Sequence, residues 1–365
     1  MKIFNKIKFF RHNPHMIEVN RNYNRKKNSS KKLLQAAVVG CGGGGLMHLS
    51  HYLWHKGAQV KTAFDIDENR FKDIKSRYPF AYNDIKCTTN FEDILNDKTI
   101  DIISIATPDH THAFYALKAI KAGKHVLCEK PMCTSIDDGQ KIISESKKSN
   151  QIFAVFQQMR FVPRNIVIKS LIEKGQLGEI YYIHTGYIHD MRVRAFEFSN
   201  WRKDPVNFQH PLFGGIHHID ILRWLAGDVD EVYTIATHKG FSKLPIDDTY
   251  LMELKLKNGG IGSITTCFSP RVPKEYHPMR IYGTKGAVHG EKIFLERNGK
   301  LTERKLKNSE YKGVPQFRAQ ISAFIDAVNG KGNKIVLPDD AQKTVETCYA
   351  AVESWKTGIP VKVNN

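Results

Sequence analysis

The stretch "LLQAAVVGCGGGGLMHLS", residues 33–50, places five glycines in six consecutive positions directly after an apolar run. The six positions are Gly40, Cys41, Gly42, Gly43, Gly44 and Gly45. They satisfy the pattern G-x-G-x-x-G, in which Gly40 permits a tight turn and Gly42 lets a diphosphate approach the backbone. Gly45 lets the following helix pack closely, and the start of that helix offers free N–H groups to phosphates. The alternative is a flexible linker, so the surrounding sequence has to decide between a ligand loop and a linker.

The segment "VKTAFDID", residues 60–67, supplies an acidic residue at the spacing that a dinucleotide site needs. Asp65 follows Gly45 by 20 residues and ends an apolar run that predicts a second strand. A carboxylate at this position accepts hydrogen bonds from the ribose hydroxyls of an adenosine and repels a 2′-phosphate. No arginine directly follows Asp65, which favours NAD over NADP. The alternative role for Asp65 is a cap at the end of the strand.

Five apolar runs without alternation predict a parallel sheet that helices cover on both faces. They are residues 33–39, 59–65, 101–107, 125–129 and 151–156. Helical patterns separate them, and Gly123 is a typical stop signal for the helix before the fourth run. Residues 33–155 are therefore predicted to form a doubly wound α/β domain, and the glycine run is predicted to be a ligand loop.

The pattern changes after residue 155. Strand-like runs now alternate between apolar and polar residues, and turn pairs such as Asn258-Gly259 and Asn298-Gly299 join them. This pattern predicts a mostly antiparallel sheet. Helices are expected around it at residues 163–174, 215–226, 316–329 and 339–356. Residues 156–365 are therefore predicted to form a second, α+β domain.

Composition indicates an ordinary globular protein. Of the 365 residues, 41% are hydrophobic, and no apolar run approaches the roughly 18 residues of a membrane span. The six cysteines form no CxxC pair and have no zinc-like spacing, so we expect no metal site and a reducing, cytoplasmic compartment.

Half of the net charge of +18 lies in residues 1–32, which hold ten Lys or Arg against the single acid Glu18. We predict that these residues form a poorly ordered, solvated arm. The alternative is a short amphipathic helix on a membrane surface, with Ile3, Phe4, Ile7 and Phe10 on one side. The remaining charge forms no basic stripe, which argues against a nucleic-acid partner.

Further motifs carry a family resemblance. They are G-x-G-x-x-G-x-x-H ending at His48, A-T-P-x-x-x-H at 106–112, A-G-K-H-V-x-x-E-K-P at 122–131, "RFVP" at 160–163, "GQLGEI" at 175–180 and "GIHHIDILRWLAG" at 215–227. With these motifs the chain resembles the Gfo/Idh/MocA oxidoreductases over residues 34–362. The resemblance implies an NAD-binding Rossmann domain at 33–155. It also implies an open-faced second domain at 156–365 that serves substrate binding and oligomerisation.

The resemblance also assigns roles to residues of the first domain. It implies that Lys130 of the E-K-P triplet touches the substrate hydroxyl beside the nicotinamide, and that Glu129 contacts the nicotinamide ribose. Thr107, Pro108 and His112 are implied in the cofactor site, and relatives often have a cis bond before the proline of E-K-P. Partial burial beside a cationic ring would favour the neutral form of Lys130 and make proton transfer accessible. The alternative is a solvated surface lysine.

In the second domain, His217 matches the histidine of the family motif D-x-x-x-H and is predicted to take the substrate's hydroxyl proton. The adjacent His218 is the rival candidate. Four residues before His217 the family usually has aspartate, whereas this chain has Phe213. The residues available to replace that carboxylate are His210, Asp190 and Tyr187.

Substrate contacts are implied for Arg160, Trp201 and Arg202, together with Lys130 and His217. A second group, Arg192, Arg194 and His189, would suit a phosphate, a carboxylate or a nucleotide diphosphate, and its alternative is a solvated basic loop. His48, His51 and His55 share one helical face. We interpret them as helix surface rather than a metal site, with His48 packed against the phosphate loop.

These expectations favour an NAD-dependent dehydrogenase of a sugar, a sugar derivative or a cyclitol. The first alternative keeps the fold but uses NAD transiently, as a lyase, epimerase or glycosidase. The second is a non-catalytic sensor that binds a dinucleotide and a protein partner. The resemblance further implies a homodimer or homotetramer that buries the open face of the second sheet.

Overall fold

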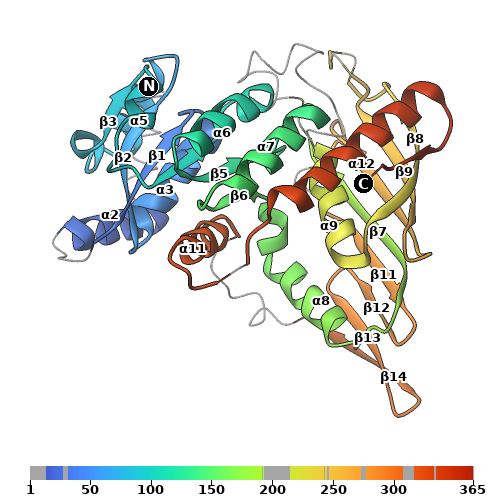
Figure 1. The fold of residues 1–365 in the computed structure, drawn as a ribbon. Helices are drawn as coiled ribbons and strands as arrows, with labels where there is room; N and C mark the ends of the chain where they lie inside the picture. The colour runs from blue at the N-terminus through green and yellow to red at the C-terminus, as the bar shows by residue number, and fades with distance from the viewer. Residues whose placement is uncertain are drawn as a thin grey trace. The chain divides into compact units, whose positions relative to one another are not determined.

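The computed structural model describes residues 14–27, 32–190, 192, 214–241, 243–244, 246–272, 277–306, 316–332 and 334–364. The chain folds into two compact units (Figure 1). Unit 1 comprises Met1–Phe156 and Phe317–Pro338, and unit 2 comprises Gln157–Gln316 and Asp339–Asn365. The first unit thus also takes in a segment from near the end of the chain, which the predicted domain at 33–155 did not include.

Unit 1 is built on six parallel strands in the order β3-β2-β1-β4-β5-β6. The strands are β1 (Leu34–Val39), β2 (Ala58–Phe64), β3 (Lys86–Thr88), β4 (Ile102–Ile105), β5 (His125–Glu129) and β6 (Phe153–Phe156). This is the strand order of a dinucleotide-binding doubly wound sheet, and it confirms the predicted fold class. The five predicted strands are present, whereas β3, with three residues, is too short to show a pattern in the sequence.

The helices of unit 1 lie between these strands. They are α3 (Gly43–Trp54), α4 (Arg70–Arg77), α5 (Glu92–Leu95), α6 (His112–Lys121) and α7 (Ile136–Lys148), with 3-10 turns at Tyr82–Asp84 and Asp109–Thr111. The hydroxyl of Ser135 caps α7 by accepting from the N–H of Asp138 at 3.2 Å. Helix α3 starts directly from the glycine run, which places its N-terminus at the carboxyl edge of the sheet.

Helix α2 (Pro14–Lys27) lies within the segment for which the charge pattern favoured a poorly ordered arm, so the structure differs from that expectation. Val19 and Tyr23, one turn apart, are buried in the core of unit 1. The ammonium of Lys26 donates to the carbonyl oxygens of Tyr52 at 2.9 Å and Ala58 at 2.7 Å. These hydrogen bonds satisfy backbone carbonyls at and just beyond the end of α3. They also hold α2 in place despite its positive charge.

Helix α11 (Gln316–Val328) is the late segment that completes unit 1. Its residues Ile321, Phe324 and Ile325 are each at most 1% exposed and belong to the core cluster that also contains Leu49 and Leu53 of α3. Beyond the helix, Val336 pairs with Val155 of β6, whose N–H donates to the Val336 carbonyl at 2.9 Å.

Unit 2 is built on a nine-stranded sheet in the order β14-β13-β12-β11-β7-β10-β9-β8-β15. The strands are β7 (Ile180–Ile188), β8 (Val229–Thr237), β9 (Thr249–Leu256), β10 (Ile261–Cys267), β11 (Met279–Gly283), β12 (Gly286–His289), β13 (Lys292–Arg297), β14 (Lys300–Lys305) and β15 (Val361–Lys362). Their pairings are antiparallel except for β7 with β10. The prediction of a mostly antiparallel sheet is therefore confirmed.

One face of this sheet is covered and the other is open. Ile183, Met252 and Ile264 alternate inward and are 0% exposed, while Ile235 and Ile261 on the opposite face are about half exposed. The helices of the unit are α8 (Pro163–Glu173), α9 (Ile216–Ala226) and α12 (Pro338–Thr357), with a 3-10 turn at Gln158–Phe161. In Figure 1, α9 and α12 lie across one side of the sheet. These three helices and α11 match the ranges that the sequence predicted, but α11 belongs to unit 1 and not to the domain of the antiparallel sheet, where it was expected.

Among the described residues, no helix combines the length and the apolar content that crossing a membrane requires. The six cysteines all lie in the described part of the chain, and none of them forms a disulfide.

Candidate functional site

The glycine run forms a tight loop between β1 and α3. Gly40 has a φ of +92°, and a Cβ atom there would lie 2.6 Å from the carbonyl oxygen of Ala106. A Cβ atom on Gly45 would lie 1.6 Å from the carbonyl oxygen of Gly40, so only glycine lets α3 begin this close to the loop. In contrast, a Cβ atom on Gly42 or Gly43 would have no heavy atom within 4 Å. This open space beside the first N–H groups of α3 fits a diphosphate.

Asp65 follows β2, and both oxygens of its carboxylate accept hydrogen bonds from the backbone. Oδ2 accepts from the N–H of Cys41 at 2.7 Å, and Oδ1 accepts from the N–H of Asp67 at 3.0 Å. Asp65 therefore ties the end of β2 to the glycine loop, as a strand-end cap would. Each carboxylate oxygen keeps a second lone pair, which leaves acceptor capacity for ribose hydroxyls. The geometry fits both roles considered from the sequence.

The motifs after β4 and β5 are joined by one buried histidine. His112, at the start of α6, is 1% exposed. Its Nδ1 lies 2.7 Å from the carbonyl oxygen of Pro131, and its Nε2 lies 2.9 Å from the carbonyl oxygen of Thr107. Pro108 follows Thr107 in the same loop, and the Lys130–Pro131 peptide bond is cis, as the resemblance implies. His112 thus steadies the two loops against each other.

Glu129 ends β5, and both of its carboxylate oxygens are engaged. Oε1 lies 3.2 Å from Nε2 of His48, and Oε2 accepts from the backbone N–H of Lys130 at 3.1 Å. Burial alone would raise the pKa of Glu129, but the hydrogen bond from His48 and the nearby charges of His48, Lys130 and His112 lower it below its ordinary value. Glu129 is therefore held as a carboxylate.

His48 lies elsewhere than predicted. It is fully buried in the middle of α3 and bridges Glu129 to Ser104 of β4, and His51 is also buried, so neither lies on the helix surface as expected. Its contact with Glu129 was missed from the sequence, although the spacing G-x-G-x-x-G-x-x-H carried the signal. Lys130 follows Glu129 and is partly buried. The loops after β1, β4 and β5 thus gather at the point where the strand order reverses, which is where open parallel sheets bind ligands.

In unit 2, the two adjacent histidines of α9 have different surroundings. His218 is fully buried, with Nδ1 against the hydroxyl of Thr185 and Nε2 at 2.9 Å from Nδ1 of His277. Burial, followed by the charges of His277, Arg164 and His184, holds the pKa of His218 well below its ordinary value. His218 is therefore a neutral core residue. His217 is 7% exposed.

Tyr187 of β7 lies among these histidines. Its ring centroid is 5.9 Å from that of His217, and its hydroxyl lies 2.8 Å from Nδ1 of His189. Of the two replacement candidates that the structure describes, Asp190 and Tyr187, Tyr187 has its ring beside that of His217. Asp190 instead forms an ion pair with Arg192, which lowers the pKa of Asp190. Arg192 uses Nε and Nη2 in this pairing.

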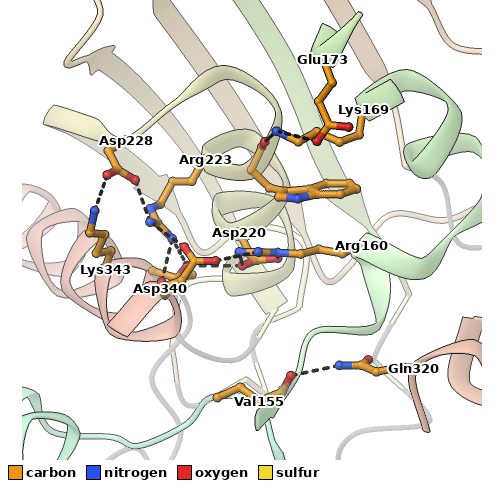
Figure 2. Close-up of polar contacts among 12 residues, drawn as sticks. Val155, Arg160, Lys169, Glu173, Asp220, Arg223, Asp228, Gln320, Asp340 and Lys343 are labelled. Carbon is orange, nitrogen blue, oxygen red and sulfur yellow. Dashed lines mark hydrogen bonds and ion pairs between the residues drawn. The ribbon is translucent and has the colours of Figure 1, made fainter. Parts of the chain in front are cut away.

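Arg160 is engaged by carboxylates of its own unit, which differs from the implied substrate contact (Figure 2). Its Nε and Nη2 donate to Asp220 at 2.9 and 2.6 Å, and its Nη1 lies 2.6 Å from Asp340. The guanidinium also faces the Trp224 ring, 5.8 Å from the ring centroid. These carboxylates engage all three guanidinium nitrogens, and the Arg160 side chain is 10% exposed, so Arg160 holds elements of unit 2 together.

A second arginine completes this ion cluster. Arg223 of α9 donates through Nη2 to Asp228 at 2.7 Å and to Asp340 at 3.0 Å, and Lys343 reaches Asp228 at 2.6 Å. Figure 2 shows that α9 is thereby connected to the first turns of α12. The sequence reasoning missed Asp220, which lies three residues after His217 on the same helix.

Other predicted residues lie outside the described part of the chain. They are Trp201, Arg202, Phe213, His210 and Arg194. Within the described residues, no group of three or more His, Cys, Asp or Glu side chains is arranged to hold a metal ion.

A doubly wound sheet, a glycine cradle at its switch point and an acid after β2 define a dinucleotide-binding protein. Residues 34–157 match the oxidoreductase family with an NAD-binding Rossmann fold, and residues 169–363 match the α/β domain that forms the C-terminal part of the same family. The chain belongs to the Gfo/Idh/MocA oxidoreductase family. It is therefore an oxidoreductase whose unit 1 is an NAD-binding domain, and the residues of the glycine cradle fit that cofactor.

Several characterised relatives act on carbohydrates. The chain is 24% identical to levoglucosan dehydrogenase of Pseudarthrobacter phenanthrenivorans, over 70% of this chain and 73% of the relative. It is 23% identical to myo-inositol 2-dehydrogenase of Thermotoga maritima, over 90% of this chain and 98% of the relative. It is 25% identical to 2,7-anhydro-N-acetylneuraminate hydratase of Escherichia coli, over 70% of this chain and 67% of the relative.

Among solved structures, a levoglucosan dehydrogenase in complex with NADH superposes with a TM-score of 0.80. It is 21% identical to this chain, and the match covers 92% of this chain and 100% of that protein. At this level of identity the likeness concerns the fold.

Proposed function

We propose that this oxidoreductase transfers a hydride between NAD and a hydroxyl-bearing carbon of a sugar, a sugar derivative or a cyclitol. The observation that carries the proposal is the contact that His48, on the helix that starts from the glycine cradle, makes with Glu129 beside Lys130. The levoglucosan and inositol dehydrogenases among the relatives support the substrate class.

The cofactor side of the site is assigned to unit 1. The proposed contacts are Gly40, Cys41, Gly42, Gly43, Gly44, Gly45, Asp65, Thr107, Pro108, His112, Glu129 and Lys130. The N–H groups at the start of α3 would bind the diphosphate, and the carboxylate of Asp65 would select an unphosphorylated ribose. NAD supplies the hydride acceptor when it is bound.

Proton handling is assigned to Lys130 and His217. The Nζ atom of Lys130 would hold the substrate hydroxyl by a hydrogen bond while its one proton leaves, which requires a partly desolvated amine. The imidazole of His217 would take the hydroxyl proton from the substrate as the hydride leaves, and the ordinary pKa of a histidine suits that step. Tyr187, which contacts His217, is proposed to take the orienting place of the family carboxylate.

A second candidate function has specific support. One relative is a hydratase by name, and a hydratase adds or removes water without net oxidation. This chain would then use NAD transiently and release it unchanged. The third reading, a non-catalytic sensor, is disfavoured because Lys130 and His217 are both retained.

The test is a screen of sugars, anhydrosugars, sugar acids, nucleotide sugars and inositols with the purified enzyme and NAD. Formation of reduced nicotinamide in proportion to oxidised product supports the dehydrogenase. Substrate conversion without net reduced nicotinamide supports the transient use of NAD. Binding of NADH in calorimetry together with no conversion of any compound in the screen would contradict both enzymatic proposals and favour the sensor.

Two further assignments belong to the proposal. The cytoplasm is proposed as the compartment, because all six cysteines are without disulfides. A homodimer or homotetramer is proposed because Ile235 and Ile261 on the open face of the unit 2 sheet are about half exposed. Sedimentation equilibrium tests this assembly.

A further inference from the structure

We propose that His48 is a positioning residue, which fixes the carboxylate of Glu129 and, through it, the backbone from which the Lys130 side chain extends. This inference rests on the proposed function, because Lys130 is there the residue that holds the substrate hydroxyl. His48 itself would contact neither cofactor nor substrate.

An unbroken chain of contacts links Ser104, His48, Glu129 and Lys130. Ser104 Oγ lies 2.6 Å from Nδ1 of His48, Nε2 of His48 lies 3.2 Å from Oε1 of Glu129, and Oε2 of Glu129 accepts from the N–H of Lys130 at 3.1 Å. The chain of contacts runs from β4 through α3 to the end of β5, all within unit 1. Both oxygens of one carboxylate are therefore used, which sets its orientation as well as its location.

The imidazole ring of His48 is buried and tightly packed. His48 is 0% exposed, and its ring centroid is 4.5 Å from that of Phe156 at the end of β6. Elements β4, β5, β6 and α3 thus surround one ring, which prevents it from rotating. A ring held this firmly transmits the geometry of the sheet to the carboxylate.

The contact between His48 and Glu129 determines which ring nitrogen of His48 carries a proton. A carboxylate only accepts, so Nε2 of His48 carries the proton in its contact with Glu129. In the neutral imidazole Nδ1 is then an acceptor, and the hydroxyl of Ser104 donates to it. Because a hydroxyl both donates and accepts, Ser104 accommodates this tautomer and holds the ring in place, in the way that outer hydrogen-bond partners orient ligating histidines at metal sites.

The location of Glu129 makes this arrangement consequential. Its carboxylate is faced by His48 from α3, by His112 from α6 and by the adjacent Lys130. Of these groups, His48 places a side-chain nitrogen, Nε2, 3.2 Å from the carboxylate oxygen Oε1. A histidine with a purely structural role would also be buried and hydrogen-bonded. Its partner would have no reason to lie next to the proposed catalytic residue, as Glu129 lies next to Lys130.

The test uses two substitutions, each of which imitates one of the two ring nitrogens of His48. Asparagine places its side-chain amide near Nδ1, so His48→Asn keeps the Ser104 side and loses the contact with Glu129. Glutamine reaches the place of Nε2, so His48→Gln keeps a donor to Glu129. We expect His48→Asn to lower kcat per folded molecule about tenfold to hundredfold, with His48→Gln restoring most of it.

The pH profile separates positioning from folding. Without the hydrogen bond from His48, burial raises the pKa of Glu129, so the acid limb of kcat/KM moves to higher pH in His48→Asn and stays in place in His48→Gln. Equal losses of Tm in both variants, with wild-type kcat and pH profile per folded molecule, would show a structural role and overturn the proposal.

A readout independent of turnover keeps the two proposals distinguishable. In ¹⁵N-histidine-labelled protein we expect the ring of His48 to be protonated at Nε2, and Glu129→Gln to shift that nitrogen resonance. A neutral ring protonated at Nδ1 would overturn the positioning role. If the wild type bound NADH but converted no polyol, the proposed function would fail while this spectroscopic result still decided the placement of Glu129.

Discussion

The guanidinium of Arg160 and the carboxylate of Asp220 are joined by two parallel contacts, Nε to Oδ2 at 2.9 Å and Nη2 to Oδ1 at 2.6 Å. Asp220 is 0% exposed and lies three residues after His217 on α9. The pair therefore fixes the helix that carries the proposed proton acceptor. The family resemblance implied a substrate contact for Arg160, and the structure shows that Arg160 holds elements of unit 2 together.

The first prediction concerns this buried pair. Arg160→Met leaves the Asp220 carboxylate buried without its bidentate partner, and we expect the free energy of unfolding to fall by about 3–5 kcal/mol. Urea denaturation measures the change. The double variant Arg160→Met/Asp220→Leu removes both charges and should recover most of the loss. As a matched control, Lys141→Met breaks an exposed pair with Asp138 and should cost at most about 1 kcal/mol.

The second prediction separates two glycines of the same loop. Gly45→Ala drives a Cβ atom into the carbonyl oxygen of Gly40, so we expect poor folding or a large loss of Tm. Gly42→Ala meets no atom within 4 Å, so the fold should persist while a methyl group enters the space proposed for the diphosphate. Calorimetry should then find at least about tenfold weaker NAD binding for Gly42→Ala. Unchanged affinity in that variant would contradict the location of the diphosphate.

The third prediction tests the proposed chemistry. Lys130→Met should leave NAD binding nearly unchanged and lower kcat by about two to four decades, as the removal of a general acid or base does. Steady-state kinetics with the substrate found in the screen, together with NADH titration, measure both quantities. The neighbouring Lys124 donates to the backbone carbonyls of Asp97 and Ile100, away from the glycine loop, and Lys124→Met is the control for loss of a positive charge. A Lys130→Met enzyme with wild-type turnover would remove Lys130 from the mechanism.

The fourth prediction is a pH dependence of stability. Burial lowers the pKa of Lys26 from its ordinary 10.5 to about 7 in the folded protein. Between these values the unfolded chain binds one more proton than the folded chain, so the free energy of unfolding rises with pH through this window and is flat below it. The slope is about 1.4 kcal/mol per pH unit. The difference in stability between wild type and Lys26→Met, measured in urea at pH 6, 8 and 9.5, should therefore grow in favour of the wild type. A difference that is constant with pH would show that Lys26 stays charged.

Much of the fold could be predicted because its signals are local. The strands of unit 1 are continuous apolar runs, and the glycine run, Asp65 and the E-K-P triplet follow strand ends at recognisable spacings. Helix α2 could not be predicted in the same way. Its buried positions Val19 and Tyr23 sit among lysines and arginines, and the charge of the segment concealed a one-sided apolar pattern.

The candidate site was predictable only where chemistry follows from sequence neighbours. Glu129 and Lys130 are adjacent, so their association was visible. Arg160 meets Asp220 only after folding, because the two are 60 residues apart in sequence. Likewise, His48 reaches Glu129 across 81 residues, and the motif that ends at His48 does not say which strand its ring faces.

Because α11 supplies Ile321, Phe324 and Ile325 to the core of unit 1, the order of synthesis matters for this protein. A nascent chain that has already produced all six strands of the NAD-binding sheet still lacks one wall of its hydrophobic interior. That wall arrives only when residues 316–328 have left the ribosome, after the whole unit 2 sheet except β15 has been made. Fragments that stop at residue 156 should therefore expose apolar surface and recruit chaperones.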